Sequence, residues 1–182
     1  MGTRGLLPFV ATANLLMLAA VSHAAPAIKV ISPAIGVDGR ISPRNSAFGE
    51  NLSPAVSWTP APGAKAYAVI LQDPDAGDPP PFIHWLIWNI PAATRALPEH
   101  VSTAPHPPSP AGAAQGRNGF GSIGYGGPKP PSGVHHSHLI VFALNAPLAL
   151  AAGADSRALS QALRGHVLAS GEIVGTFAAP KP

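Results

Sequence analysis

Two apolar runs, residues 66–72 and 83–90, constrain the fold of this chain more than any other feature. In both runs the side chains at odd and even positions are largely apolar, whereas a strand with one solvent-facing side alternates between apolar and polar residues. Each run therefore has the pattern of a strand that is covered on both faces and lies in the centre of a sheet. The sequence predicts a mainly β protein built around these two strands.

The composition supports one folded domain rich in strands and turns. Of the 182 residues, 46% are hydrophobic and 10% are charged, which excludes an intrinsically disordered chain. The 19 glycines and 23 prolines favour short strands and turns over long helices. No cysteine is present, so thiol catalysis and thiolate metal ligands are excluded. The net charge of +3 comes from scattered basic residues, which argues against a nucleic-acid partner.

Residues 1–24 have the pattern of a signal peptide. A basic residue near the start is followed by an apolar stretch over residues 6–21, and small residues end the segment at Ala24. We expect cleavage after Ala24 or Ala25, which leaves a domain over residues 26–182 in the periplasm or outside the cell. An uncleaved membrane anchor is the alternative, but a proline and an asparagine interrupt the apolar stretch.

Further strands and one helix are predicted around the central pair. The helix begins at Asp155 or Ser156, because either side chain can cap it, and it carries an apolar stripe at helical spacing. Residues 91–131 are rich in proline and glycine and form a long irregular connection, which is typical of a functional loop. The other predicted strands cover residues 28–32, 55–58, 139–145 and 172–177.

The connection between the two central strands concentrates polar groups. Three of the eight acidic residues fall within residues 73–78, among four prolines at positions 74–81. His84 follows at the start of the next strand, where the two-residue period places it on the face of Leu86 and Trp88. The carboxylates either organise the loop by accepting backbone hydrogen bonds or belong to a binding site. His84 is correspondingly either a hydrogen-bonded core residue or part of that site.

Several short motifs follow one another in a specific order along residues 28–178. In this combination the chain resembles the phosphatidylethanolamine-binding protein family, also called Raf kinase inhibitor-like proteins, and in particular its exported bacterial branch. The motifs are Asn51-Leu52-Ser53-Pro54, Asp73-Pro74-Asp75-Ala76, His84-Trp85, Gly124-Tyr125-Gly126-Gly127-Pro128, Pro130-Pro131 and Gly133-Val134-His135.

This resemblance implies a large central sheet packed on a smaller sheet, with a peripheral C-terminal helix. It also implies a small pocket that binds anionic groups such as phosphate or a phospholipid headgroup. The chain departs from the family at two positions, with Ser137 where a tyrosine is usual and Gly77 where a proline is usual. The implied ligand-binding residues are Asp73, Asp75, His84, Gly124, Tyr125, Pro130, Pro131 and His135.

These residue types suit a small anionic or zwitterionic ligand. A protonated imidazole donates hydrogen bonds to phosphate from both nitrogens, and a carboxylate receives an ammonium group. Backbone N–H groups of a glycine-rich segment add further donors. We expect binding without catalysis, cofactor or metal; contact with membrane lipid and the identity of any protein partner stay open.

Two functions of other classes stay open. An Asp and His cluster could serve a hydrolase as a general acid–base pair or hold a divalent metal. The family resemblance also implies a second alternative, in which the protein inhibits a protein target such as a kinase or a protease. The sequence has no His-Glu helical metal motif and no serine in a nucleophile elbow, which favours the binding protein.

Overall fold

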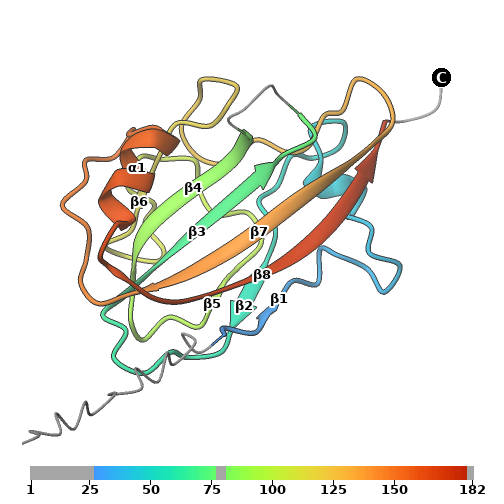
Figure 1. Cartoon of the computed structure of the whole chain (residues 1–182). Coiled ribbons are helices and arrows are strands. Elements are labelled where there is room, and N and C mark those ends of the chain that lie inside the picture. Colours follow the sequence, from blue (N-terminus) through green and yellow to red (C-terminus); the bar gives the residue numbers. More distant parts are fainter. Residues whose placement is uncertain (1–26, 77–80, 180–182) are drawn as a thin grey trace, which may run out of the picture.

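The computed structural model describes residues 27–76 and 81–179, and in this part of the chain it shows two antiparallel sheets and one α-helix (Figure 1). The predicted mainly β architecture with a larger and a smaller sheet is confirmed. The predicted signal peptide lies outside the described residues. The larger sheet has the order β6 (Ala114–Gln115), β4 (Phe82–Pro91), β3 (Ala66–Asp73), β7 (Val134–Leu144), β8 (Val167–Ala178), and the smaller has the order β1 (Val30–Ile31), β2 (Val56–Trp58), β5 (Ala96–Leu97).

The two predicted central strands, β3 and β4, do lie in the interior of the larger sheet. β3 pairs with β4 on one side and with β7 on the other, so neither of its edges is free. Seven of its eight residues are buried. Apolar side chains on both faces are therefore required, and the sequence supplies them at successive positions.

Two apolar cores lie on opposite faces of the larger sheet. The first packs the sheet against β1, β2 and β5, and the second packs it against α1 (Ser156–Leu163). Trp85 and Ile87 of β4 belong to the first core, whereas Leu86 and Trp88 belong to the second, as the two-residue period requires. Main contributors to the first core are Val56, Trp58, Leu71, Trp85, Leu97 and Leu139, and to the second Ile70, Leu86, Trp88, Leu159 and Leu163.

The helix begins where the sequence predicts. Asp155 is its N-cap, and the Asp155 carboxylate accepts a hydrogen bond of 2.8 Å from the backbone N–H of Ala158. Leu159 and Leu163 form its buried stripe against the sheet. Within the described residues, no helix has the length and apolar character needed to cross a membrane.

β7 and β8 are longer than the sequence predicts. β7 begins at Val134 rather than at residue 139, and β8 begins at Val167 rather than near residue 172. The two strands pair with each other over almost their whole length, from Val134 opposite Ala178 to Leu144 opposite Val167. This pairing makes strands of histidine-rich and glycine-containing segments whose own residues give a weak strand signal.

The first described residues cross close to β8, which explains a glycine in the middle of that strand. The backbone N–H of Ile28 donates to the Ser170 carbonyl at 3.0 Å. A Cβ atom on Gly171 would lie only 1.7 Å from the carbonyl oxygen of Ile28. Gly171 therefore permits a close backbone approach rather than a turn.

Candidate functional site

A β-bulge between β3 and β4 decides the orientation of His84. Leu71 is paired with Trp85, but the next residue of β3, Gln72, is paired with Ile83, so His84 is the extra residue. The His84 ring consequently faces Asp73, on the side of the sheet that carries Trp85. The prediction that His84 shares a face with Leu86 and Trp88 was wrong, because the strict two-residue period fails at a bulge.

Asp73 is the buried carboxylate at the end of β3, with only 2% of its surface exposed. Its Oδ1 accepts hydrogen bonds from the backbone N–H groups of Asp75 at 2.8 Å and Ala76 at 3.1 Å. Its Oδ2 accepts a hydrogen bond from His135 Nδ1 at 2.9 Å. Asp73 thus has both roles that the sequence left open, since it organises the loop and orients a histidine.

The two histidine rings are held by acceptors on their Nδ1 atoms. His84 Nδ1 lies 2.7 Å from the carbonyl oxygen of Gly126, and His135 Nδ1 lies 2.9 Å from Asp73. Since both partners only accept, each Nδ1 carries the proton. His84 Nε2 is buried without a hydrogen-bond partner among the described residues, 3.9 Å from Asp73 Oδ2. It is thus available to an outside group, as an acceptor when the ring is neutral and as a donor when it is protonated.

The surroundings of Asp73 keep it ionised. Burial raises the pKa of the Asp73 carboxyl, but the His84 and His135 rings and the N–H of Asp75 together outweigh burial and hold that pKa below its ordinary value. The site therefore carries a negative charge at neutral pH, next to two imidazole rings.

The side chains of Asp73, His84 and His135 line one pocket of about 190 Å³. Its walls are aromatic on one side, where the Phe82 ring lies 5.1 Å from His84 and 4.8 Å from Phe120 between ring centroids. Lys129 contributes an exposed ammonium group at the rim. The lining residues are Asp73, Ala76, Phe82, His84, Phe120, Lys129, Pro130, Pro131 and His135.

Three of the implied ligand-binding residues do not line this pocket. Tyr125 points into the core, where its hydroxyl donates to the carbonyl oxygen of Asn45 and burial raises its pKa. Gly124 is not among the lining residues, and its backbone lies so close to Thr103 that a Cβ atom there would be 2.9 Å from the Thr103 Cα. Asp75 lies at the surface, where its Oδ2 accepts from both the backbone N–H of His136 at 2.8 Å and the ring Nδ1 at 2.7 Å.

Four residues that line the pocket were not predicted from the sequence. Ala76 belongs to the quoted Asp73 motif, and Phe82 lies two residues before His84. Phe120 lies between two glycines, and an isolated aromatic residue in such a segment was a usable signal. Lys129 lies between two prolines of the rim. The contribution of Phe120 and Lys129 depends on how the 116–131 loop folds over the start of β4, which sequence spacing does not show.

Two asparagines fix the shape of that loop. Asn118 accepts from the backbone N–H of Phe120 at 3.0 Å and donates to the Gly124 carbonyl at 3.0 Å. Asn51 accepts from the backbone N–H of Gly127 at 2.7 Å. Together they place the ring of Phe120 in the pocket wall and the carbonyl of Gly126 against His84.

A family model described as phosphatidylethanolamine-binding protein matches residues 31–178. The chain belongs to this family. A UPF0098 protein of Methanothermobacter thermautotrophicus is 42% identical over 140 residues, which are 76% of this chain and 91% of that protein. The crystal structure of Escherichia coli YbcL, described as a new member of the mammalian family, matches with a TM-score of 0.78 and 29% identity, covering 85% of this chain and all of that one. A family homologue from Chlamydia trachomatis matches with a TM-score of 0.73 and 29% identity, covering 85% of this chain and 99% of that one.

The predicted family and fold are thereby confirmed, and membership of the phosphatidylethanolamine-binding protein family supports a protein that binds small ligands. Of the two predicted departures from the family, Gly77 lies outside the described residues. Ser137 is fully buried, and its hydroxyl has no hydrogen-bond partner among the described residues. It borders a separate cavity of about 10 Å³ with Leu71 and Tyr125 and is not among the residues that line the pocket.

The described residues also bear on the metal alternative. Within residues 27–76 and 81–179, no group of three or more His, Asp or Glu side chains is arranged to hold a metal ion. The Asp73, His84 and His135 side chains meet, but the Nδ1 atoms of both rings are already engaged and His84 Nε2 stands 3.9 Å from the carboxylate. The arrangement is one of oriented hydrogen-bonding groups around a small pocket.

Proposed function

We propose that this protein binds a small anionic or zwitterionic ligand, phosphate or a phosphoethanolamine-like headgroup, in the pocket of Asp73, His84 and His135. The observation that carries the proposal is the buried Nε2 of His84, which has no hydrogen-bond partner among the described residues and belongs to a pocket-lining ring. A buried polar atom left without a partner costs free energy, which a ligand that bonds to it recovers.

The charges around the pocket suit a phosphate group. A protonated His84 donates from Nε2 to a phosphate oxygen, and Asp73 Oδ2 at 3.9 Å stabilises the positive ring. Lys129 supplies a further positive charge at the rim. A zwitterionic ligand gains more, because its ammonium group is attracted by the ionised carboxylate of Asp73.

We infer binding without catalysis. The residues that line the pocket include no serine, threonine or cysteine, so the described pocket has no hydroxyl or thiol nucleophile. Both rings donate from Nδ1 to fixed acceptors, which holds them in place for recognition.

The decisive experiment is calorimetric titration of the purified protein with inorganic phosphate and with phosphoethanolamine. We expect saturable binding of both, and loss of binding in the double variant His84→Ala, His135→Ala. His138→Ala is the matched control, because His138 lies on the same strand but pairs with Glu172 away from the pocket. Equal binding by the wild type and the double variant would refute the pocket assignment.

We further propose that the protein is exported, on the signal-peptide pattern of residues 1–24. Expression of the full chain in a bacterial host tests this proposal. The expected result is a periplasmic or secreted product whose N-terminus, measured by mass spectrometry, follows Ala24 or Ala25. An intact N-terminus on a membrane-bound product would support the uncleaved anchor instead.

A further inference from the structure

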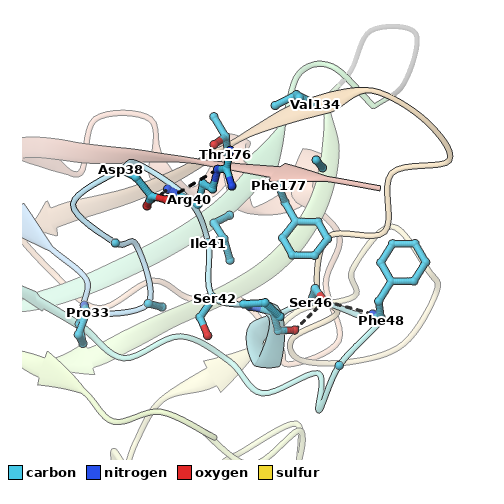
Figure 2. A pocket seen from close by; sticks show the side chains of 15 residues that line it. Pro33, Asp38, Arg40, Ile41, Ser42, Ser46, Phe48, Val134, Thr176 and Phe177 are labelled. Carbon is cyan, nitrogen blue, oxygen red and sulfur yellow. Dashed lines mark hydrogen bonds and ion pairs between the residues drawn. The ribbon is translucent and has the colours of Figure 1, made fainter. Parts of the chain in front are cut away.

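A second and larger hollow lies beside the C-terminal end of β8 (Figure 2). It encloses about 1060 Å³ between β8 and the segment that contains residues 33–49. This segment is attached to β8 by hydrogen bonds between Ile41 and Thr176 at 2.8 Å and between Thr176 and Gly39 at 2.9 Å. The rings of Phe48 and Phe177 stack at one end of the hollow, with centroids 6.3 Å apart and planes 14° apart. We call this hollow the β8 groove.

The β8 groove presents apolar side chains to its opening. Phe48 is 46% exposed and Val134 is 57% exposed, although both are large hydrophobic residues. The charged side chains in its wall are Asp38 and Arg40. They form an ion pair with 3.7 Å between Arg40 Nε and Asp38 Oδ2, so their charges offset each other. Exposed apolar side chains gathered in one hollow mark a place where an apolar group binds.

The β8 groove adjoins the ligand pocket through two pairs of residues. His135 of the pocket is directly opposite Phe177 of the groove across β7 and β8, so their side chains lie on the same face of the sheet as close neighbours. Lys129 of the pocket rim places its ammonium group 5.9 Å from the centre of the Phe48 ring. A charged site and an apolar site therefore share one border.

We propose that the β8 groove binds the apolar chain of a single-chain amphiphile whose phosphate group occupies the pocket. The inference rests on the proposed function, because it requires the anionic group to be held by His84 and His135. The pocket is too small for more than a headgroup-sized moiety, whereas the groove is several times larger and is lined largely by apolar side chains. The shared border at Phe48 and Phe177 lets one ligand occupy both sites at once.

A series of n-alkyl phosphates from ethyl to octyl, used below their micelle-forming concentrations, tests the inference. Each methylene that enters the groove is expected to lower the Kd about two- to fourfold. The readout is the slope of affinity against chain length, since a uniform change in phosphate binding leaves this slope unaltered. Inorganic phosphate gives the reference affinity of the pocket alone.

Matched variants test whether the dependence of affinity on chain length arises in the β8 groove. The double variant Phe48→Ser, Val134→Ser is expected to flatten it while inorganic phosphate still binds. Val167→Ser is the control, because Val167 is 43% exposed and lies at the far end of β8, outside the groove. The control is expected to keep the wild-type slope.

Four outcomes would overturn the inference. A flat slope in the wild type with intact phosphate binding would refute the groove and leave the proposed function standing. An unchanged slope in the double groove variant would place the chain elsewhere. Failure of both phosphate and alkyl phosphates to bind would refute the proposed function together with the inference. A dimer that dissociates in the groove variant, with no chain-length effect, would assign the groove to a second copy of the protein.

Discussion

Asp73 and His135 meet across neighbouring strands, with His135 Nδ1 donating to Asp73 Oδ2 at 2.9 Å. The same carboxylate closes the turn that follows β3 through its other oxygen. One buried side chain therefore couples the shape of the loop to the orientation of a pocket ring. Because of this coupling, changes at Asp73 are expected to affect both the stability of the protein and the proposed ligand binding.

Asp73→Asn is expected to destabilise the protein by about 1–3 kcal/mol, because the amide keeps one acceptor but places N–H groups against the His135 donor. The free energy of unfolding in urea measures the effect. Asp155→Asn is the control, since asparagine caps a helix as well as aspartate does. Equal effects of the two substitutions would contradict the role assigned to Asp73.

The stability of the protein is expected to fall in acid through Asp73. Its pKa in the folded state lies below the ordinary value, so its contribution is fully present above about pH 4, the unfolded pKa, and is lost as the pH falls through the folded pKa. Unfolding free energies measured between pH 2 and pH 6 test this. The difference between the wild type and Asp73→Asn should shrink below about pH 4, and a difference that is constant over the whole range would contradict it.

Lys129→Gln is expected to weaken phosphate binding about two- to fivefold, because an exposed charge at the rim contributes up to about 1 kcal/mol. The loss should diminish at high salt, which screens exposed charges. Calorimetry at two ionic strengths measures both effects. Lys65→Gln, which removes an exposed lysine outside the pocket, should leave binding unchanged.

Asn118→Ala is expected to reduce phosphate affinity although Asn118 does not line the pocket. The substitution removes the acceptor for the Phe120 N–H and the donor to Gly124, so the loop that carries Phe120 and the Gly126 carbonyl loses its fixed shape. Comparison with Asn145→Ala, which removes side-chain hydrogen bonds near Gly165, separates a local effect from general destabilisation. Unaltered affinity in a folded Asn118→Ala protein would show that the pocket does not depend on this loop geometry.

Much of the fold follows from local sequence. The two runs that are apolar on both faces identify β3 and β4 as interior strands, because burial on both sides demands such a pattern. Asp155 marks the start of α1 because a capping side chain acts within its own first turn. The motifs shared with the family predicted that Asp73, His84 and His135 lie close together, and the three side chains do line one pocket.

The remaining features depend on contacts between segments that are far apart in the chain. The strand character of residues 134–138 comes from pairing with β8, and the β8 groove exists because residues 39–41 attach to that strand. The pocket wall comes from a loop that Asn51 and Asn118 hold in place. None of these pairings has a local signal, because each depends on which residue a distant backbone reaches.

The sequence by itself determined the two interior strands, the start of the helix, and the positions of Asp73 at the end of one interior strand and His84 near the start of the other. Only the tertiary structure decided which way His84 points. The two-residue period placed it with Leu86 and Trp88, whereas the register of β4 against β3 inserts one extra residue and turns the ring toward Asp73. A bulge is a property of two paired strands, so the order of residues along one of them does not reveal it.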